Sequence, residues 1–292
     1  NLSAEKSQIA EHETVGLTAS ISAPHSRDVV VDFKSSGSAV LNDDYKFEAA
    51  AEDTFKTILL ENINTETLTV EDDKYFGITD IHVDSLGNIY TLERERGGWS
   101  YTHILKHNIN LGTREVVAGR TFDENQFDEN INLRRAYGFY IDDKMDIYVA
   151  EESESRVVKF KNGSKTFEVV AGGNGYGDAA NQLRSPKDVF VKNDTIYVAD
   201  DGNQRIMRYD PDSTQGVLVA GGNGQGNNAN QLNYPRGVFV DSSGNIYVAD
   251  TNNNRVQKWA PNASAGTTIA GGNGTTDVCN NLSQLYEPLK VF

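Results

Sequence analysis

Short apolar runs separated by turn-forming clusters recur along most of the chain. Within 235–259 three runs, GVFV, NIYVA and RVQKW, are divided by DSSG and DTNNN, and a fourth run follows at 267–270. Gly, Asn, Asp and Ser favour turns, so each run predicts a short strand. Near-copies of this unit lie at 186–209 and, more loosely, at 135–160. The pattern predicts an all-β protein built from repeats.

The second strand of each copy carries a tyrosine, and these tyrosines are 58, 49 and 50 residues apart: Tyr90, Tyr148, Tyr197 and Tyr247. A period near fifty with four short strands per unit is typical of a propeller blade. The second strand is apolar on both faces, which indicates that neighbouring blades cover it on both sides. We predict blades at about 75–134, 135–185, 186–234 and 235–287, and the start of another at 288–292.

The segment PRGVFVDSSGNIYVADTNNNRVQKW, followed by AGGNG at 270–274, resembles NHL repeats, and the triplet Asn254-Arg255-Val256 stands where the family has its naming residues. The resemblance covers about 68–292 and is strongest in the third and fourth copies. It implies an NHL β-propeller over 65–292, commonly six-bladed. Since only four units and the start of a fifth are present, we expect an incomplete ring unless four blades can close, and a closing strand at 67–70 that pairs with a blade outside this chain.

The front section, 1–64, resembles a Calx-beta domain, which implies a partial β-sandwich. The residues that carry the resemblance are Ala10-Glu11, the segment VVVDFKSSGSA, Asp44-Tyr45 and the strand-like run at 54–60. The spacing of apolar residues over 47–62 also fits a helix. Some Calx-beta domains bind calcium, but Glu11, Asp43 and Asp44 supply fewer oxygen ligands than the six to eight that calcium takes.

Charge narrows the range of partners. The net charge is −15, with 5 basic against 11 acidic residues over 1–64 and 22 against 31 over the remainder. An acidic chain lacks the basic surface that nucleic acids require, so we expect no nucleic-acid partner. No apolar run approaches the roughly 20 residues of a membrane span, and we expect no direct membrane insertion.

In a blade that runs from inner to outer strand, the turn between the second and third strands and the loop to the next blade open on the same face. That face receives 201–204, 251–254 and the long polar loop 221–231. Recognition residues are common on such loops, so we expect the loop face to bind the partner. The alternative is that Gly, Asn and Asp serve there only as turn residues, with positive φ and local hydrogen bonds.

Three acid–arginine pairs recur at a spacing of five, at the ends of the second strand and the start of the third. A carboxylate and a guanidinium at that spacing can pair across the turn or between blades. This favours a structural clamp over a catalytic pair. The pairs are Glu151 with Arg156, Asp200 with Arg205, and Asp250 with Arg255.

The first unit departs from the pattern. Nine residues separate Glu93 from His103, where the later copies have four. The insert and the next loop carry residue types common in binding hot spots, and we predict partner binding by Arg94, Arg96, Trp99, Tyr101, Phe122 and Phe127. The same loop suggests a calcium site formed by Asp123, Glu124, Asp128 and Glu129. The alternative is an irregular, solvated end blade.

Enzyme function is not expected from these residues. Of the five histidines, His82, His103 and His107 fall within one unit and none recurs around the axis, so a zinc site built from separate blades cannot be assembled from them. The single cysteine, Cys279, excludes an intrachain disulfide. We predict a non-enzymatic binding or scaffold protein of the cell surface or outside the cell, with a protein or glycan partner and no cofactor. The resemblances imply a bacterial adhesion role. The alternative is a propeller lyase or hydrolase with catalytic residues in blades outside this chain.

Overall fold

The computed structural model describes residues 2–4, 17–19, 75–84, 87–95, 101–108, 113–119, 132–272 and 285–292. The chain divides into two units, Asn1–Glu71 and Asp72–Phe292. In the first unit, β1 (Leu2–Ala4) pairs with β2 (Leu17–Ala19) in antiparallel register. The rest of the predicted Calx-beta-like sandwich, with its acidic residues, the helical alternative at 47–62 and the predicted closing strand at 67–70, lies outside the described residues.

The second unit contains four antiparallel sheets, called blades 1 to 4 here, each with four strands in chain order. Blade 1 comprises β3 (Tyr75–Val83), β4 (Ile89–Glu95), β5 (Tyr101–Asn108) and β6 (Thr113–Gly119), with β7 (Leu133–Arg134) also paired to β5. Blade 2 comprises β8 (Ala136–Ile141), β9 (Ile147–Glu151), β10 (Arg156–Phe160) and β11 (Phe167–Gly172).

Blades 3 and 4 repeat this plan with a short 3-10 turn between their second and third strands. Blade 3 comprises β12 (Pro186–Lys192), β13 (Thr195–Asp200), η2 (Asp201–Asn203), β14 (Arg205–Tyr209) and β15 (Val217–Gly221). Blade 4 comprises β16 (Pro235–Val240), β17 (Ile246–Asp250), η3 (Thr251–Asn253), β18 (Arg255–Trp259) and β19 (Thr267–Gly271).

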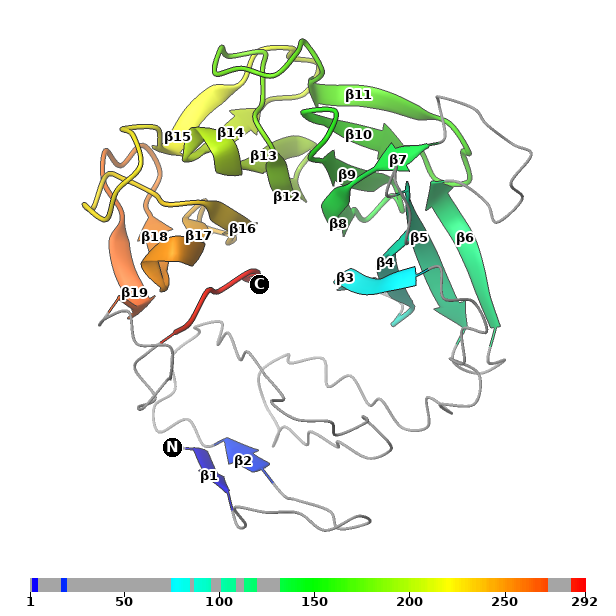
Figure 1. Cartoon of the computed structure of the whole chain (residues 1–292), viewed down its shortest axis with the longest axis horizontal. Helices are drawn as coiled ribbons and strands as arrows, with labels where there is room; N and C mark the ends of the chain where they lie inside the picture. The colour runs from blue at the N-terminus through cyan, green and yellow to red at the C-terminus, as the bar shows by residue number, and fades with distance from the viewer. Residues whose placement is uncertain are drawn as a thin grey trace. The chain divides into compact units, whose positions relative to one another are not determined.

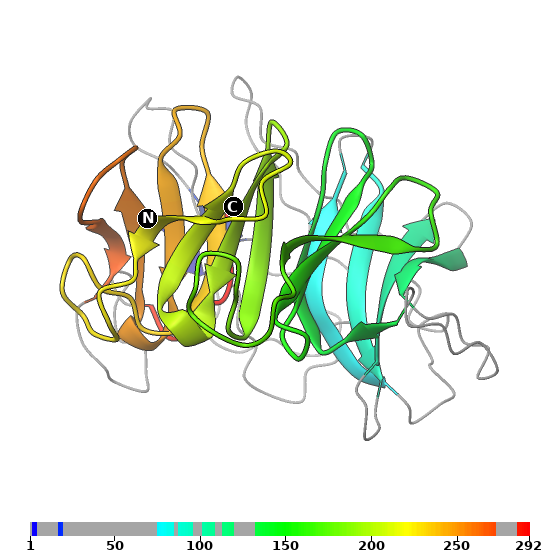
Figure 2. The ribbon, with the colours of Figure 1, turned by 90° about the horizontal axis from the view of Figure 1, so that it is seen from above.

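The blades stand side by side around a common centre. Figure 1 shows their first strands, β3, β8, β12 and β16, innermost, with the C-terminal segment 285–292 beside β16. Seen from the side in Figure 2, the strands of this unit run between two faces that carry the turns and loops. The described residues form an arc of blades and do not show a closed ring. Within the same residues, no helix is long and apolar enough to cross a membrane.

The arc is held by apolar residues packed between consecutive blades. Val149, Val198 and Val248, at the middle of three second strands, are fully buried. Leu92 and Ile104 of blade 1 belong to one buried cluster with Val149 of blade 2, and comparable clusters join blades 2 and 3 and blades 3 and 4. Full burial of one such side chain contributes roughly 1.5–3 kcal/mol. Blade stacking therefore explains why the second strands are apolar on both faces.

Near the axis, equivalent positions of successive inner strands alternate between a carboxylate and a glycine: Asp80, Gly138, Asp188 and Gly237, with Lys290 next in the C-terminal segment. Asp80 Oδ2 accepts a 2.9 Å hydrogen bond from the backbone N–H of Phe139. Asp188 Oδ2 accepts one of 3.0 Å from the N–H of Val238. Each carboxylate thus binds the residue that follows the glycine of the next blade.

The glycines permit close approach of the next inner strand. A Cβ at Gly138 would lie 2.6 Å from the carbonyl oxygen of Lys187, and one at Gly237 would lie 2.8 Å from that of Leu289. Carbon and oxygen atoms do not approach so closely without a shift in the backbone. Lys290 Nζ then donates to Asp80 Oδ2 and Asp188 Oδ1, both at 2.7 Å.

Two residues further along each inner strand, aromatic side chains form a chain across the blades. Ring centroids are 5.2 Å apart for His82 and Tyr140, 4.9 Å for Tyr140 and Phe190, and 5.1 Å for Phe190 and Phe239, all with edge-to-face geometry. Burial, with a smaller contribution from Lys290, lowers the pKa of His82 to about 4. His82 therefore packs as a neutral ring at neutral pH.

Candidate functional site

Four equivalent segments enter the inner strands on the loop face, and we call them together the axial rim: 134–137, 184–187, 233–236 and 286–289. Each follows a leucine, and the leucines of the first three, Leu133, Leu183 and Leu232, are fully buried. The rim residues themselves differ from blade to blade: RRAY, RSPK, NYPR and YEPL. A constant framework therefore presents variable side chains around the axis.

The second residue of each rim segment has a left-handed backbone conformation. The φ angles are 46° at Arg135, 53° at Ser185, 53° at Tyr234 and 43° at Glu287. Side chains other than glycine are uncommon there, because the Cβ atom crowds the backbone. None of the four positions uses glycine, so the rim retains side chains at a conformational cost, and such strain is concentrated at functional sites.

The predicted clamp carboxylates hold the rim by accepting hydrogen bonds from its backbone N–H groups. Asp200 Oδ1 accepts a 2.7 Å hydrogen bond from the backbone N–H of Arg184, and Asp250 Oδ1 one of 2.7 Å from that of Asn233. Glu151 Oε1 accepts an equivalent bond of 2.8 Å from the N–H of Arg134. Each acid therefore fixes the first residue of the rim segment beside its own blade.

The second oxygen of each carboxylate binds the paired arginine across the turn. The distances from the arginine Nε are 2.6 Å for Arg156 to Glu151, 2.6 Å for Arg205 to Asp200, and 2.7 Å for Arg255 to Asp250. Burial raises the pKa of all three acids, against the opposing effects of the arginines and the N–H donors. The pairing lies within each blade and not between blades.

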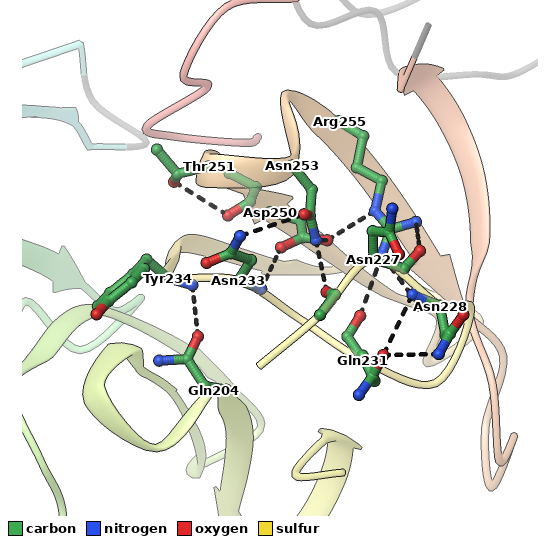
Figure 3. A network of polar contacts seen from close by, with 12 residues as sticks. Gln204, Asn227, Asn228, Gln231, Asn233, Tyr234, Asp250, Thr251, Asn253 and Arg255 are labelled. Atoms are coloured by element: carbon green, nitrogen blue, oxygen red, sulfur yellow. Dashed lines mark hydrogen bonds and ion pairs between the residues drawn. The ribbon is translucent and has the colours of Figure 1, made fainter. Parts of the chain in front are cut away.

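The clamp arginines also hold the long loops. Arg255 donates through its terminal nitrogens to three carbonyl oxygens, those of Asn227, Asn228 and Gln231, at 2.9–3.2 Å. Figure 3 shows this network, with Asp250 between Arg255, Asn253 and the rim residue Asn233. Arg205 makes the same contacts with the loop between blades 2 and 3. One buried ion pair therefore couples the turn, the rim and the loop.

Several Asn and Gln side chains of the long loops form hydrogen bonds within the loops. Asn223 Nδ2 donates to the carbonyls of Gly221 and Asn230, and Gln231 Nε2 donates to the carbonyl of Asn223. Asn174 and Gln182 repeat this arrangement in the preceding loop. These contacts favour the structural interpretation of the Gly-Asn-Gln loops.

Charged rim side chains pair with acids at the ends of the second strands. Lys187 Nζ lies 3.1 Å from Glu152 Oε1, and Arg236 Nε lies 3.6 Å from Asp201 Oδ1. Burial raises the pKa of Asp201 to about 6, opposed by Lys187 and Arg236. Arg135 Nε also faces Glu152, at 3.4 Å. Arg135 and Arg236 are thus each more exposed than the carboxylate that they face, whereas Lys187, at 12% exposed, is slightly more buried than Glu152, at 17%.

Tyr137 completes the rim between blades 1 and 3. Lys187 Nζ lies 3.7 Å from the centroid of its ring, and the guanidinium carbon of Arg94 lies 5.1 Å from it. Both distances fall within the range of cation–π contacts. Arg94, one of the predicted partner-binding residues, therefore borders the rim.

Of the other residues predicted for partner binding in the first repeat, Tyr101 lies in the described part of the chain and adjoins the rim. Tyr101 begins β5, where its backbone pairs with Arg134. Arg96, Trp99, Phe122 and Phe127 lie outside the described residues, as do the predicted calcium ligands Asp123, Glu124, Asp128 and Glu129. Both hypotheses therefore remain predictions.

A search of the described residues finds no cluster of three or more His, Cys, Asp or Glu side chains that could hold a metal ion. His107 Nε2 lies 2.7 Å from Thr91 Oγ1, and His82 belongs to the aromatic chain at the axis. These two histidines are part of the packing of blade 1 and its contact with blade 2.

The residues of the rim could have been found by comparing the tetrapeptides that follow each loop leucine. The second strands reveal the repeat because they are the most constant part of each copy. A candidate binding position shows the opposite pattern: its residue changes from copy to copy while the residues around it stay constant.

The comparisons with known proteins support the repeat interpretation. Residues 232–259 match the family model described as NHL repeat. The match does not extend to the front section, so the Calx-beta resemblance stays a prediction. No match was found among curated proteins.

Several solved structures are similar to this chain. One, a structural genomics protein of unknown function from Bacteroides thetaiotaomicron VPI-5482, has 14% identity, covers 72% of this chain and 52% of its own, and gives a TM-score of 0.51. A nidogen/laminin complex has 17% identity, coverages of 64% and 61%, and a TM-score of 0.47. An auxiliary nutrient binding protein from Bacteroides ovatus ATCC 8483 has 13% identity, coverages of 75% and 65%, and a TM-score of 0.47.

This chain spans between 52% and 65% of the length of these three proteins. At such identities the first match shows a shared fold and leaves the function open.

Proposed function

We propose that this chain is a non-enzymatic binding protein of the cell surface or extracellular space that holds its partner on the axial rim. The observation that carries the proposal is the difference between two sets of arginines. Arg205 and Arg255 are buried and donate to several acceptors within their own loops. Arg135 and Arg236 are 49% and 41% exposed and face carboxylates at 3.4 and 3.6 Å. The first set builds the scaffold, and the second is presented to solvent.

The types of residue in the rim support this role. Arginine and tyrosine dominate binding hot spots, since each combines a large contact area with directional hydrogen bonds. The rim segments contain four arginines and three tyrosines among 16 residues: Arg134, Arg135, Arg184, Arg236, Tyr137, Tyr234 and Tyr286. A protein or a glycan is the class of partner that we propose.

The test is to screen the purified chain on a printed glycan array and a peptide array. The variant Arg135→Gln/Arg236→Gln removes two rim cations, and the control Lys144→Gln/Lys161→Gln removes two exposed cations from the turns of blade 2 on the opposite face. We expect array signals that disappear in the rim variant and persist in the control. Signals that survive in the rim variant would place binding elsewhere, and consumption of an array ligand would indicate an enzyme.

A further inference from the structure

We infer that the axial rim binds an acidic polysaccharide, one whose sugar units carry carboxylates. This inference rests on the proposed function and names the class of partner for the same site.

The rim reverses the charge of the chain. The whole sequence has 42 acidic and 27 basic residues. The 16 rim residues include one acid, Glu287, and five bases: Arg134, Arg135, Arg184, Lys187 and Arg236. At physiological ionic strength charges are screened over about 8 Å, so a bound ligand responds to the rim and to the acids paired with it, Glu152, Glu154 and Asp201, rather than to the net charge of the chain.

The ion pairs of the rim are unequally exposed. The Arg236 side chain is 41% exposed and that of Asp201 is 6% exposed; Arg135 is 49% exposed and Glu152 is 17% exposed. In these two pairs the guanidinium group is the more exposed partner, so an anionic ligand can approach Arg135 and Arg236 from solvent. The pairs Arg134–Glu154 and Lys187–Glu152 lack this difference, with side chains 32% and 36% exposed and 12% and 17% exposed.

The side chain of Arg236 is partly open to solvent. Arg236 Nε is buried and faces Asp201 Oδ1 at 3.6 Å, so the exposed part of this side chain, which is 41% exposed, is what a ligand can reach. By comparison, Arg205 donates to Asp200 and to the carbonyls of Asp178, Ala179 and Gln182. Guanidinium groups bind carboxylates through two parallel hydrogen bonds, so a carboxylate is the complementary ligand group for the rim.

The rim backbone offers little to an extended peptide. The N–H groups of Arg184, Asn233 and Tyr234 already donate to Asp200, Asp250 and Gln204, and that of Glu287 donates to Asn254. Peptides recognised by strand addition need free main-chain groups. A ligand that carries its acceptors as side groups on each unit suits this surface better.

Exposed tyrosines provide the second element that a sugar requires. Tyr176, at the edge of the rim, is 62% exposed, and the guanidinium carbon of Arg184 lies 5.0 Å from its ring centroid. Tyr234 is also exposed. A tyrosine ring combines an apolar face with a polar tip, which matches the apolar face and hydroxyl edge of a sugar ring.

The experiment measures binding of the whole chain to four probes by biolayer interferometry at 50 and 150 mM NaCl. Polygalacturonate is the acidic polysaccharide, and fully methyl-esterified polygalacturonate has the same sugars without the charges. Poly-L-glutamate and single-stranded poly-uridylate represent acidic peptides and nucleic acids. We expect polygalacturonate to bind most tightly, the ester to bind at least about 10-fold more weakly, and salt to weaken binding, because the attraction is between charges.

The variants assign this binding to the rim. Arg135→Gln/Arg236→Gln should lower the affinity for polygalacturonate about 10-fold or more, and Lys144→Gln/Lys161→Gln, with the same change in net charge, should lower it less than about twofold. Equal binding of the ester, tighter binding of poly-L-glutamate or poly-uridylate, or no binding of polygalacturonate would each overturn the inference. If the arrays then show a neutral glycan or a protein segment whose binding depends on the rim, the proposed function holds and only the inference of an acidic polysaccharide fails.

Discussion

Lys290 donates a 2.7 Å hydrogen bond to Asp188, although 102 residues separate them in the sequence. The same ammonium group donates to Asp80, so carboxylates of blades 1 and 3 share one cation from the C-terminal segment. Burial raises the pKa of Asp188 to about 6, against the opposing effect of Lys290. Although burial alone would lower the pKa of Lys290, the two carboxylates raise it. Ion pairs as well as packing therefore hold the inner strands of blades 1 and 3 and the C-terminal segment together.

Lys290→Met should destabilise the arc. Removal of the cation leaves two enclosed carboxylates without their shared partner, and loss of one member of a buried pair costs roughly 3–5 kcal/mol. We expect the free energy of unfolding to fall by about 3 kcal/mol, the lower limit of that range, because a quarter of the Lys290 side chain is exposed. Urea unfolding at pH 7.5 measures it. The loss should shrink at pH 5, where protonation of Asp188 removes its charge, and an equal loss at both pH values would contradict this explanation.

Asp188 should make stability depend on pH between about 4 and 6. In the folded state its pKa is raised from 3.8 to about 6, so in this interval the folded protein binds a proton that the unfolded chain does not. Stability therefore falls as pH rises through the interval, by up to about 3 kcal/mol from this one group. Asp188→Asn removes the titrating group and should flatten this part of the profile. Thermal unfolding at several pH values compares the two proteins, and parallel profiles would contradict the assignment.

Arg255→Lys should destabilise blade 4 and loosen the loop above it. Lysine keeps the charge but cannot reach Asp250 and the three loop carbonyls together. We expect a loss of about 3 kcal/mol, and faster amide exchange for residues of the loop 222–233. Lys161→Ala is the control, because its pair with Glu168 is exposed and should contribute less than about 1 kcal/mol. Unchanged amide exchange in this loop would show that Arg255 does not hold the loop in place.

Gly138→Ala tests the close approach at the axis. The new methyl group would lie 2.6 Å from both Asp188 Oδ1 and the carbonyl oxygen of Lys187, so we expect a loss of about 3 kcal/mol from overpacking. Gly163→Ala is the matched control: its φ is +75° and nothing lies within 4 Å of the added carbon. Gly163→Ala should therefore destabilise the protein only by the cost of holding an alanine in the left-handed conformation, about 1 kcal/mol. Denaturant unfolding should rank the two variants in this order, and the reverse order would exclude crowding at the axis.

Gln257→Met should stabilise the protein. Gln257 is fully buried, and within the described part of the chain neither its Oε1 nor its Nε2 has a hydrogen-bond partner. Blade 3 has Met207 at the equivalent place. Removing an unsatisfied buried amide should gain about 1–2 kcal/mol. Gln204→Met should instead destabilise, because the Gln204 amide binds Tyr234 N–H and the Asp201 carbonyl. Loss of stability in both variants would reveal an acceptor or a water near Gln257.

The sequence was sufficient to predict the strands of each blade, because every second strand repeats an apolar run around a tyrosine. The acid–arginine spacing also drew attention to Asp250 and Arg255, which the structure places in contact. Their further contacts could not be predicted, since hydrogen bonds to loop carbonyls leave no trace in residue identity. The binding of Asn233 N–H by Asp250 is of this kind.

The contact between Asp80 and Lys290 was also beyond sequence reasoning. The residues are 210 positions apart; Asp80 lies in an inner strand and Lys290 in the C-terminal segment, and the equivalent position is glycine in blades 2 and 4. Only the arrangement of blades around the axis brings them together. The left-handed φ of Arg135 and Tyr234, just before two inner strands, also could not be predicted, because neither residue type favours that conformation.

The alternation of Asp80, Gly138, Asp188 and Gly237 means that neighbouring blades are not interchangeable. A carboxylate must face a blade whose equivalent residue lacks a side chain, so odd and even blades carry complementary halves of one contact. Removing or duplicating a single blade would place two carboxylates or two glycines at neighbouring positions. Adding or removing two consecutive blades would keep the alternation. Over these four blades the axial contact therefore repeats every hundred residues or so (about two periods near fifty), twice the repeat that the strands display.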